Sequence, residues 1–492
     1  MGYKLQVTGW VAFSTAFNIL NTVVYGTLFP EILHNLDAGF SKEFSIVNVI
    51  TTLASSVILP FVGSVTDQLH TIKRWMIWAS FFAVPATFLY ALLAVIPRGN
   101  YSLILAETLY VVVMFALRLA VMNNNALLSR FPATKRVMLS LINNIFGFGA
   151  ALLSLAVLRL VTGALTPTTS VGVFLATHLA GLREMDPVTR LAILVVSYTA
   201  LAFFATFFSF FSPTDAPATQ PQAPARPPEE DPLNSARNDL ETTPLVEFPK
   251  PPVPKVTFVR ACVRSFSDVL LTLKSIRTDR KAKESAVFLF AYLFFSTAGV
   301  VYTIFVVTFF TSVYQIHIET QSLLQLFYMS AQVAGVFFGM VFVRIVKGFD
   351  LITLTCQNVI FCCTFALLYF SVSMSWGYVS SLAISLVIAF TYSWNASVAR
   401  GMMAKLIPPG KECLFMGFYS TFTYIGITVV SAINGALSNM PPQTLCVLLG
   451  FFLLPSFIFL FWLSRLLRAD KVAAQSSLVE DAASPAIGGS RQ

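Results

Sequence analysis

Two ionisable side chains, Glu107 and Arg118, interrupt an otherwise apolar stretch of this sequence at residues 102–126. Charged groups are costly to bury in such a stretch, so they mark candidate sites for substrate binding or proton transfer. Asn125 closes the same stretch, and separations of eleven and seven residues place all three side chains on one helical stripe within about 20°. A guanidinium group matches the two oxygens of a carboxylate, and a partly desolvated carboxyl group suits a proton carrier.

Both residues also have structural interpretations, which the sequence leaves open. Glu107 can reach water at the nearer end of its apolar stretch, and Arg118 can brace carbonyl groups of neighbouring helices. A second polar stripe, formed by Asn18, Asn21 and Tyr25, crosses the first apolar stretch of the chain. Hydrogen bonds between helices are the alternative there to a substrate site.

The composition indicates which elements position these side chains. Hydrophobic residues make up 56% of the chain, and 47 residues are phenylalanine, which is typical of polytopic membrane proteins. Apolar runs of about 20 residues, long enough to cross a hydrocarbon core, recur from end to end. We predict an all-α polytopic membrane protein with twelve transmembrane helices in two six-helix bundles, at 9–29, 44–66, 75–96, 102–126, 139–163 and 189–211, and at 285–313, 321–343, 351–371, 377–398, 414–436 and 443–464.

A change of composition separates the two sets of spans. The segment after the sixth span is rich in proline and nearly free of apolar runs, which predicts a disordered linker. Beyond it, Val259, Phe266 and Leu270 recur at helical spacing among cations. They predict a basic amphipathic helix that lies on the membrane surface or packs under the second bundle. The expected domains are a first bundle at 1–211, the linker at 212–254, the amphipathic helix at 255–284, a second bundle at 285–467 and a tail at 468–492.

Charge placement predicts orientation. Lys and Arg residues gather in the connections on one side of the predicted spans, so both termini and the linker are expected to be cytoplasmic. The net charge is +9, but no soluble domain carries a basic face, which argues against nucleic-acid binding. We find no metal-ligand spacing among the six cysteines and no nucleophile–base pair or phosphate-binding loop, so we expect no enzyme activity, no cofactor and no metal. The expected partners are the lipid bilayer and a small-molecule substrate, and the oligomeric state stays open.

The loop after the second span has the chemistry of a gate between helices. In "PFVGSVTDQLHTIKRWM", Gly63 allows two helices to approach closely, and Asp67 can sit against a helix N-terminus or an arginine. Lys73 and Arg74 suit the cytoplasmic surface. A solvated turn that obeys the same charge rule is the alternative interpretation.

A second charged turn, "KLIPPGKECLFMGFYSTFTYIG", lies between two apolar stretches. The preceding helix is expected to end in Arg400 and the next to begin near Leu414, because Pro408-Pro409-Gly410 forbids a continuous helix through the connection. Glu412 then falls at the N-terminus of the next helix, where the helix dipole favours a carboxylate. It can be an ordinary helix-end charge or one half of a gate pair with Arg400 or Lys73.

Taken in order, several stretches resemble the vacuole effluxer family of the major facilitator superfamily. They are "AFSTAFNILNTVVYGTLFPEIL", "NNNALLSRFPATKRVMLSLINNIFGFGAAL", "AVFLFAYLFFSTAGVVYTI", "GVFFGMVFVRIVKGFD" and "ARGMMAKLIPPGKECLFMGFYS". In the last of these, Arg400, Leu406, Ile407, Pro408, Gly410, Glu412, Phe415 and Gly417 fall at the spacing of the family.

The resemblance implies the major facilitator fold and a secondary transporter that works by alternating access. It favours a small polar solute, above all amino acids, moved across a vacuolar or lysosome-like membrane, with protons as a candidate coupling ion. It also implies a cytoplasmic gate formed by Gly63, Asp67, Lys73, Arg74, Arg400 and Glu412. Two alternatives stay open: a transporter of a sugar, nucleoside or other organic metabolite at the plasma membrane, and a non-transporting membrane sensor.

Overall fold

The computed structural model describes residues 3–20, 40–93, 100–161, 187–208, 211, 257–316, 318–346, 350–436, 441 and 443–483, and this part of the chain contains no strand. The N-terminal half contains α1 (Tyr3–Ile19), α3 (Phe40–Leu69), α4 (Ile72–Leu93), α5 (Asn100–Leu127), α6 (Arg136–Val161) and α9 (Pro187–Phe208). The C-terminal half contains α11 (Arg280–Tyr314), α12 (Ile318–Ile345), α13 (Asp350–Ser373), α14 (Tyr378–Leu406), α15 (Glu412–Ala436) and α16 (Thr444–Ala483). Between the halves lies α10 (Phe258–Ser275), and two short 3-10 turns, Leu128–Arg130 and Ala133–Lys135, join α5 to α6.

Each predicted span overlaps one of these long helices. Within the described residues, 8 helices are long and apolar enough to cross a membrane. The all-helical membrane fold predicted from the sequence is therefore confirmed, whereas the number of twelve crossings stays a prediction.

Local sequence explains where the helices begin and end. Backbone groups find no hydrogen-bond partner in lipid, so a crossing segment satisfies them within a helix. α14 ends just before Pro408 and Pro409, and Gly410 adopts the left-handed region with a φ of 82° in the turn to α15. α11 begins after Asp279, whose side chain accepts a hydrogen bond of 3.0 Å from the N–H of Lys281. Asp279 is thus an N-cap, which satisfies one of the free donors of the first turn.

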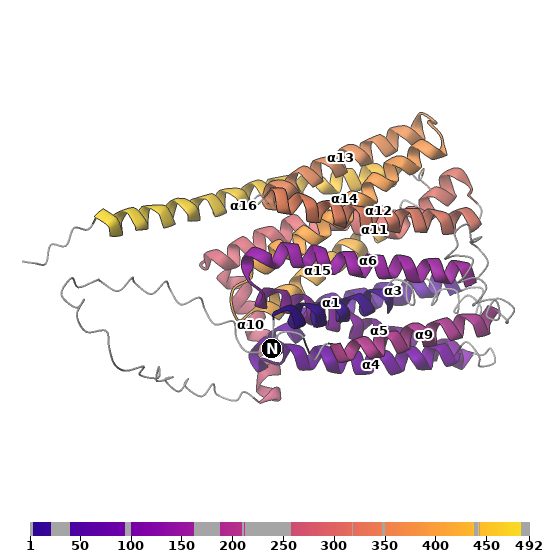
Figure 1. The fold of residues 1–492 in the computed structure, drawn as a ribbon, viewed down its shortest axis with the longest axis horizontal. Coiled ribbons are helices and arrows are strands. Elements are labelled where there is room, and N and C mark those ends of the chain that lie inside the picture. The colour runs from indigo at the N-terminus through magenta and orange to yellow at the C-terminus, as the bar shows by residue number, and fades with distance from the viewer. Residues whose placement is uncertain are drawn as a thin grey trace, which may run out of the picture.

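The long helices form two bundles that lie against each other (Figure 1). In the first bundle, α1 packs against α6 and α9, and α4 packs against α5 and α9. In the second, α11 packs against α15 and α16, and α14 packs against α12 and α13. Among the described residues, the bundles are joined chiefly by α3 with α15, α5 with α15, α6 with α12 and α6 with α14. Any movement of one bundle against the other must break contacts between these pairs.

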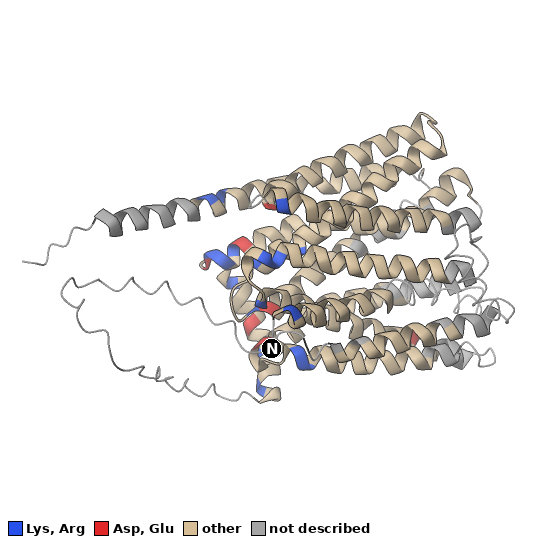
Figure 2. Cartoon of the chain, in the orientation of Figure 1, with Lys and Arg blue, Asp and Glu red and all other residues tan. Residues whose placement is uncertain are grey.

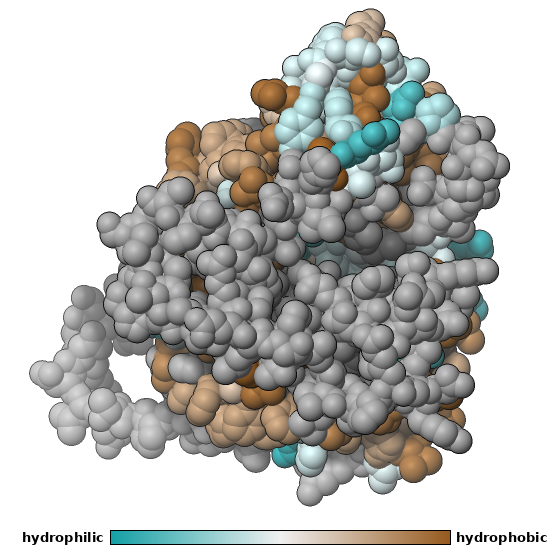
Figure 3. All heavy atoms as spheres, turned by 90° about the vertical axis from the view of Figure 1, so that its right-hand side faces the viewer, coloured by the Kyte–Doolittle hydropathy of each residue, from teal (hydrophilic) through white to brown (hydrophobic). Residues whose placement is uncertain are grey.

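Charged residues gather at one end of the two bundles, the left-hand end in Figure 2. The same end carries α10 and the N-terminus (Figure 1). Figure 3 looks onto the opposite end, where brown, hydrophobic residues predominate along the lower and left-hand flanks. Apolar flanks and one charged end are expected of a membrane protein that follows the positive-inside rule.

Three predicted segments lie between and after the bundles: the linker, the amphipathic helix and the tail. The linker predicted at 212–254 lies outside the described residues. α10 forms within the segment predicted to be an amphipathic helix, but it packs chiefly on α3 of the first bundle rather than under the second. α16 continues through Ala483, so the predicted tail begins as helix. Residues 469–483 contain no glycine or proline to stop the helix, which ends before Ser484-Pro485.

Candidate functional site

The two bundles meet along a seam between α3 and α15, which begins at the charged end. There the carboxylate of Asp67 accepts hydrogen bonds from the backbone N–H groups of Cys413 (2.9 Å) and Leu414 (2.8 Å). Both donors belong to the first turn of α15, whose helix dipole attracts a negative charge. Further along the same seam, the hydroxyl of Thr421 donates to the carbonyl oxygen of Ser56 (2.6 Å). Asp67 of the first bundle therefore caps a helix of the second.

Small residues make this close approach possible. A Cβ atom on Gly63 would lie 2.5 Å from the carbonyl oxygen of Cys413, and one on Gly417 would lie 2.9 Å from the Cα of Pro60. A Cβ on Gly401 of α14 would likewise lie 2.5 Å from a backbone Cα of α6. Because the obstructing atoms belong to backbone, no rotation of a side chain could make room. The seam therefore needs glycine at Gly63 and Gly417, and the contact of α14 with α6 needs it at Gly401.

Two arginines complete the contact at this end. Arg130 lies 3.6 Å from Glu412, and both side chains are almost fully buried, at 7% and 6% exposure. Arg136 at the start of α6 donates to the carbonyl oxygens of Phe131 (2.9 Å) and of Ala404 in α14 (2.7 Å). Sequence reasoning did not propose either arginine for the gate. The sequence feature that could have predicted them is the stretch "SRFPATKR", which places cations directly after a span that faces the second bundle.

The predicted gate residues take different positions in the structure. Asp67, Gly63 and Glu412 lie on the seam, as described above. Lys73 is half-buried in the first turn of α4, whereas Arg74 is exposed and lines an outer groove with apolar residues of α4. An exposed position on that face gives Arg74 no contact with the seam. Its inclusion in the gate is therefore corrected.

The predicted pairing of Glu412 with Arg400 is also corrected. Among the described residues, the ion pair of Glu412 is with Arg130, and none involves Arg400. The reason is geometric: Arg130 ends the turn after α5, directly beside the N-terminus of α15. Arg400 instead interacts electrostatically with tyrosines of the second bundle.

Arg118 lies at the inner end of the seam, where α5 meets α3 and α15. Its guanidinium donates to the carbonyl oxygen of Thr51 (2.9 Å) and to the hydroxyls of Ser55 (2.9 Å) and Thr52 (3.0 Å). The same group lies over the ring of Tyr424 in α15, 4.4 Å from its centroid. A cation on an aromatic face is attracted by the ring quadrupole. Arg118 thus holds α5 to α3 and touches the opposite bundle.

The other predicted substrate residues are spread over the first bundle. Glu107 is half-buried on the same continuous helix as Arg118, and Asn125 is buried near its end. The side chain of Asn18 lies directly against Gly147, so it fills a close contact between α1 and α6. Asn21 and Tyr25 lie outside the described residues.

Arg400 lies at the interface of the bundles and has a different environment from Arg118. Ser397, one turn before it on α14, accepts a hydrogen bond of 2.6 Å from the side chain of Asn144 in α6. The Nε of Arg400 is buried without a hydrogen-bond partner. Its charge interacts with three tyrosines, Tyr292, Tyr392 and Tyr419.

We call this group the tyrosine cluster: Tyr292, Tyr392, Tyr419 and Arg400. The rings of Tyr292 and Tyr419 are stacked, with centroids 3.9 Å apart, and both side chains are buried. Thr423 donates to the hydroxyl of Tyr292 (3.1 Å). The cluster combines several hydroxyl groups with one cation that has no ion pair among the described residues, which is a suitable environment for an anionic group.

The first bundle also contains buried amides, Asn123 and Asn124 on α5 and Asn143 on α6, which sequence reasoning missed. The sulfur of Cys413 donates to Asn123 (3.3 Å), and the indole N–H of Trp10 donates to the carbonyl oxygen of Asn124 (2.7 Å). The remaining side-chain atoms Asn123 Nδ2, Asn124 Oδ1 and Asn143 Oδ1 are buried without hydrogen-bond partners. The run "NNN" at 123–125 in an apolar span was the available signal, because buried amides are costly unless they are paired.

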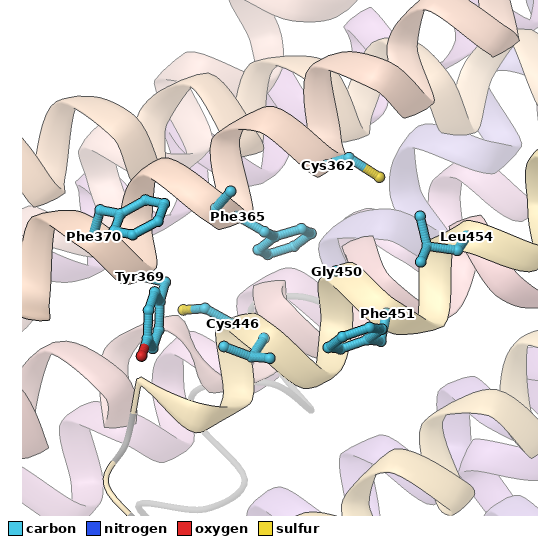
Figure 4. Close-up of a pocket in the computed structure, with 10 residues that line it drawn as sticks. Cys362, Phe365, Tyr369, Phe370, Cys446, Gly450, Phe451 and Leu454 are labelled. Carbon is cyan, nitrogen blue, oxygen red and sulfur yellow. The ribbon is translucent and has the colours of Figure 1, made fainter.

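Outer cavities are not candidates for this site. A cavity of about 300 Å³ lies between α13 and α16, where the side chains of Phe365, Tyr369, Phe451 and Leu454 line it (Figure 4). Its lining is apolar and belongs to one bundle, so it suits a lipid chain rather than a polar solute. The described residues also contain no group of His, Cys, Asp or Glu side chains that could hold a metal ion.

Solved structures with a similar fold are transporters of the major facilitator superfamily and related carriers. The human organic anion transporter MFSD10 (TETRAN) is 11% identical, with a TM-score of 0.59 over 93% of this chain and 98% of that chain. An outward-facing bacterial homologue of the iron transporter ferroportin is 13% identical, with a TM-score of 0.61 over 94% and 99%. The transporter FucP in its outward conformation is 14% identical, with a TM-score of 0.59 over 94% and 98%. At these identities the likeness shows the fold, and no curated protein matches the chain by sequence.

A family profile gives the more specific result. The profile described as "Vacuole effluxer Atg22 like" matches residues 43–473, which run from the start of α3 into α16 and include α10 and the seam but not α1. With the shared fold, this match makes the protein an integral multi-pass membrane transporter and not an enzyme. The chain belongs to the Atg22-like vacuole effluxer family.

Proposed function

We propose that this transporter carries amino acids across a vacuolar or lysosome-like membrane by alternating access. The description of its family supports the choice of membrane and the transport of a solute out of the vacuole. The Lys and Arg residues gathered at the α10 end support a cytoplasmic position for that end (Figure 2). In this orientation, the seam of α3 and α15 closes the cytoplasmic side.

Opening toward the cytoplasm then requires the two bundles to separate along the seam. The hydrogen bonds from α15 to Asp67 and the pair of Glu412 with Arg130 each join groups of opposite bundles. Contacts of this kind stabilise the closed state only, so weakening them shifts the population toward the open state. We assign Gly63, Asp67 and Glu412 to this gate, together with Arg130.

For the cargo, we assign the carboxylate-binding role to Arg400 rather than to Arg118. The single observation that carries this assignment is that Arg400 has a buried, unpartnered Nε and no ion pair among the described residues. Arg118, in contrast, already donates to Thr51, Thr52 and Ser55. A planar guanidinium fork binds a carboxylate with two parallel hydrogen bonds, and tyrosine hydroxyls nearby can donate to it as well.

Glu107 is the proposed proton carrier. It is half-buried on α5, toward the end of the bundle away from the gate. Partial desolvation is the condition under which a carboxyl group takes up and releases protons near the acidity of a vacuolar lumen.

The test is uptake of radiolabelled amino acids by liposomes that contain the purified chain. Each transported amino acid is compared with the amine that lacks its carboxylate. Arg400→Gln should raise KM for the amino acid about thirtyfold, since a hydrogen-bonded charge pair is worth about 2 kcal/mol. The same substitution should leave the weak transport of the amine unchanged.

Arg344→Gln is the matched control, because Arg344 is an exposed arginine near the same end of the second bundle. It should transport like the unaltered chain. Equal KM values for Arg400→Gln and Arg344→Gln would refute the role of Arg400. Absence of amino-acid flux through folded, correctly inserted protein would refute the proposed cargo.

A further inference from the structure

α10 presents three different faces along its length. The buried stripe faces the protein: Ala261, Ser265, Val269 and Thr272 are buried, and Asp268 beside them is half-buried. The next stripe is apolar and exposed: Val259, Val263, Phe266, Leu270 and Leu273. The third carries cations and is also exposed: Arg260, Arg264, Ser267, Leu271 and Lys274. Residues in each stripe recur every three or four positions, so each stripe is one face of the helix.

The buried stripe holds α10 against both bundles. Asp268 accepts hydrogen bonds from Gln68 and from Ser64 (3.5 Å) in α3. Thr272 accepts one from Lys411 (3.0 Å), just before α15 begins. α10 therefore bridges the outside of the seam and runs across the end of the bundles rather than along them (Figure 1).

The side chains of the apolar stripe are highly exposed, which would be unfavourable if they faced water. Val263 is 70% exposed and Leu270 is 67% exposed, although the helix already packs on the protein through its other face. Two ring contacts join this side of α10 to the flank of the first bundle: Phe266 lies 4.5 Å from Phe61 of α3, and Phe258 lies 6.3 Å from Trp75 of α4, centroid to centroid. The apolar stripe thus continues the lipid-facing surface of the spans.

We propose that the two exposed stripes of α10 bind anionic phospholipid of the adjacent leaflet. The apolar stripe would enter the boundary of the acyl chains while the neighbouring cations contact the negative headgroups, as in amphipathic helices that lie in the membrane interface. The cations favour a lipid leaflet over a second copy of the chain, because two copies would bring like charges together. That this leaflet is the cytoplasmic one rests on the orientation proposed above.

This contact bears on transport because α10 joins the two sides of the gate. Asp268 is bound to the first bundle, while α11 of the second bundle follows four residues after α10 ends. Attraction between lipid and the exposed stripes holds α10 at the membrane surface. This attraction stabilises the state of the gate, open or closed, in which α10 lies at that surface. The amount of anionic lipid in the leaflet would then change the ratio of open to closed gates.

The experiment uses the full chain in nanodiscs of phosphatidylcholine with increasing fractions of radiolabelled phosphatidylserine. A benzophenone side chain replaces Val263, Leu270 or Leu271, and light cross-links it to whatever it touches. Leu271 is the matched control for depth, because it is an exposed leucine on the cationic stripe, which the proposal places at the headgroups and not among the acyl chains. We expect lipid cross-links at Val263 and Leu270 that rise with the phosphatidylserine fraction, and few at Leu271.

A second arm separates charge from apolar burial. The double variant Arg260→Gln, Arg264→Gln should lose the dependence on phosphatidylserine, whereas Arg465→Gln, Arg468→Gln on α16, where both arginines are also exposed, should keep it. Equal lipid cross-linking at all three positions would overturn the proposal. Cross-links to a second copy of the chain, or a dependence on phosphatidylserine that survives loss of Arg260 and Arg264, would overturn it as well. The readout does not depend on transport, so a failure here would leave the proposed function standing.

Discussion

The carboxylate of Asp67 lies 2.8 Å from the backbone nitrogen of Leu414 and thereby caps a helix of the opposite bundle. An interbundle cap is unusual among helix caps because the two partners must separate if the bundles rock apart. A side chain that is almost fully buried, at 7% exposure, cannot exchange this bond for one to water without such a movement. Closure of the seam therefore fixes the position of α15. A substitution at Asp67 should remove this coupling.

Asp67→Asn should shift the gate toward its open state. The amide keeps the shape of the side chain, but its NH₂ group meets a backbone N–H and cannot accept from it. Loss of about 2 kcal/mol from a charge-assisted bond would change the ratio of closed to open states about thirtyfold. The measurement is the rate of maleimide labelling of a cysteine introduced on the seam-facing side of α15. Asp350→Asn is the control, because Asp350 pairs with Lys405 inside the second bundle, and its labelling rate should match that of the unaltered chain.

Gly63→Ala should also open the seam, although alanine is the better helix former. In an unobstructed helix this change stabilises by about 1 kcal/mol. At Gly63 the new Cβ would meet the carbonyl oxygen of Cys413 at 2.5 Å, so the bundles must move apart. Gly149→Ala is the matched control, since a Cβ there meets nothing within 4 Å. We expect faster labelling of the seam and a lower Tm for Gly63→Ala only; equal behaviour of the two variants would show that the seam tolerates a wider spacing.

The spans and the gate turn were predictable because each depends on local sequence. Apolar runs determine where a chain can cross lipid, and Pro408 and Pro409 forbid a helix regardless of what surrounds them. The partners of Arg118 were not predictable in this way. Thr52 and Ser55 are common residues, and whether they face α5 depends on the rotation of α3 about its own axis. That rotation is determined by packing over the whole bundle.

At the gate, too, the features that depend on local sequence were predictable and those that depend on tertiary packing were not. Glu412 was expected at a helix N-terminus from its place after Gly410, and it lies there. Its ion-pair partner was sought among Arg400 and Lys73, but Arg130 holds that position. Arg136 binds a backbone carbonyl of Ala404, and a backbone acceptor has no residue type by which sequence could reveal it. Charge patterns therefore predicted the end of the molecule where the gate forms, while the individual pairs required the tertiary structure.

Glu107→Gln should remove the dependence of transport on a pH gradient while leaving exchange intact. Glutamine has nearly the same shape but cannot bind and release a proton, so steps that require only cargo binding should continue. The measurement compares uptake driven by an acid-outside gradient, which moves cargo away from the acidic side as export from a vacuole does, with counterflow at equal pH in the same liposomes. Gradient-driven uptake that survives in Glu107→Gln would exclude Glu107 as the proton carrier, and loss of counterflow as well would indicate a structural role.

Arg118→Lys should lower stability without changing KM for the cargo. The guanidinium donates to three oxygens of α3 and covers the ring of Tyr424, and an ammonium group cannot reproduce this fork or its stacking. We expect a loss of about 2 kcal/mol in the free energy of unfolding and a lower Tm in lipid nanodiscs. Tyr424→Leu combined with Arg118→Lys should cost less than the sum of the two single changes, because both remove the same contact. A raised KM at unchanged stability would instead return the carboxylate-binding role to Arg118, since only a cargo contact would lower affinity while leaving the packing of α3, α5 and α15 intact.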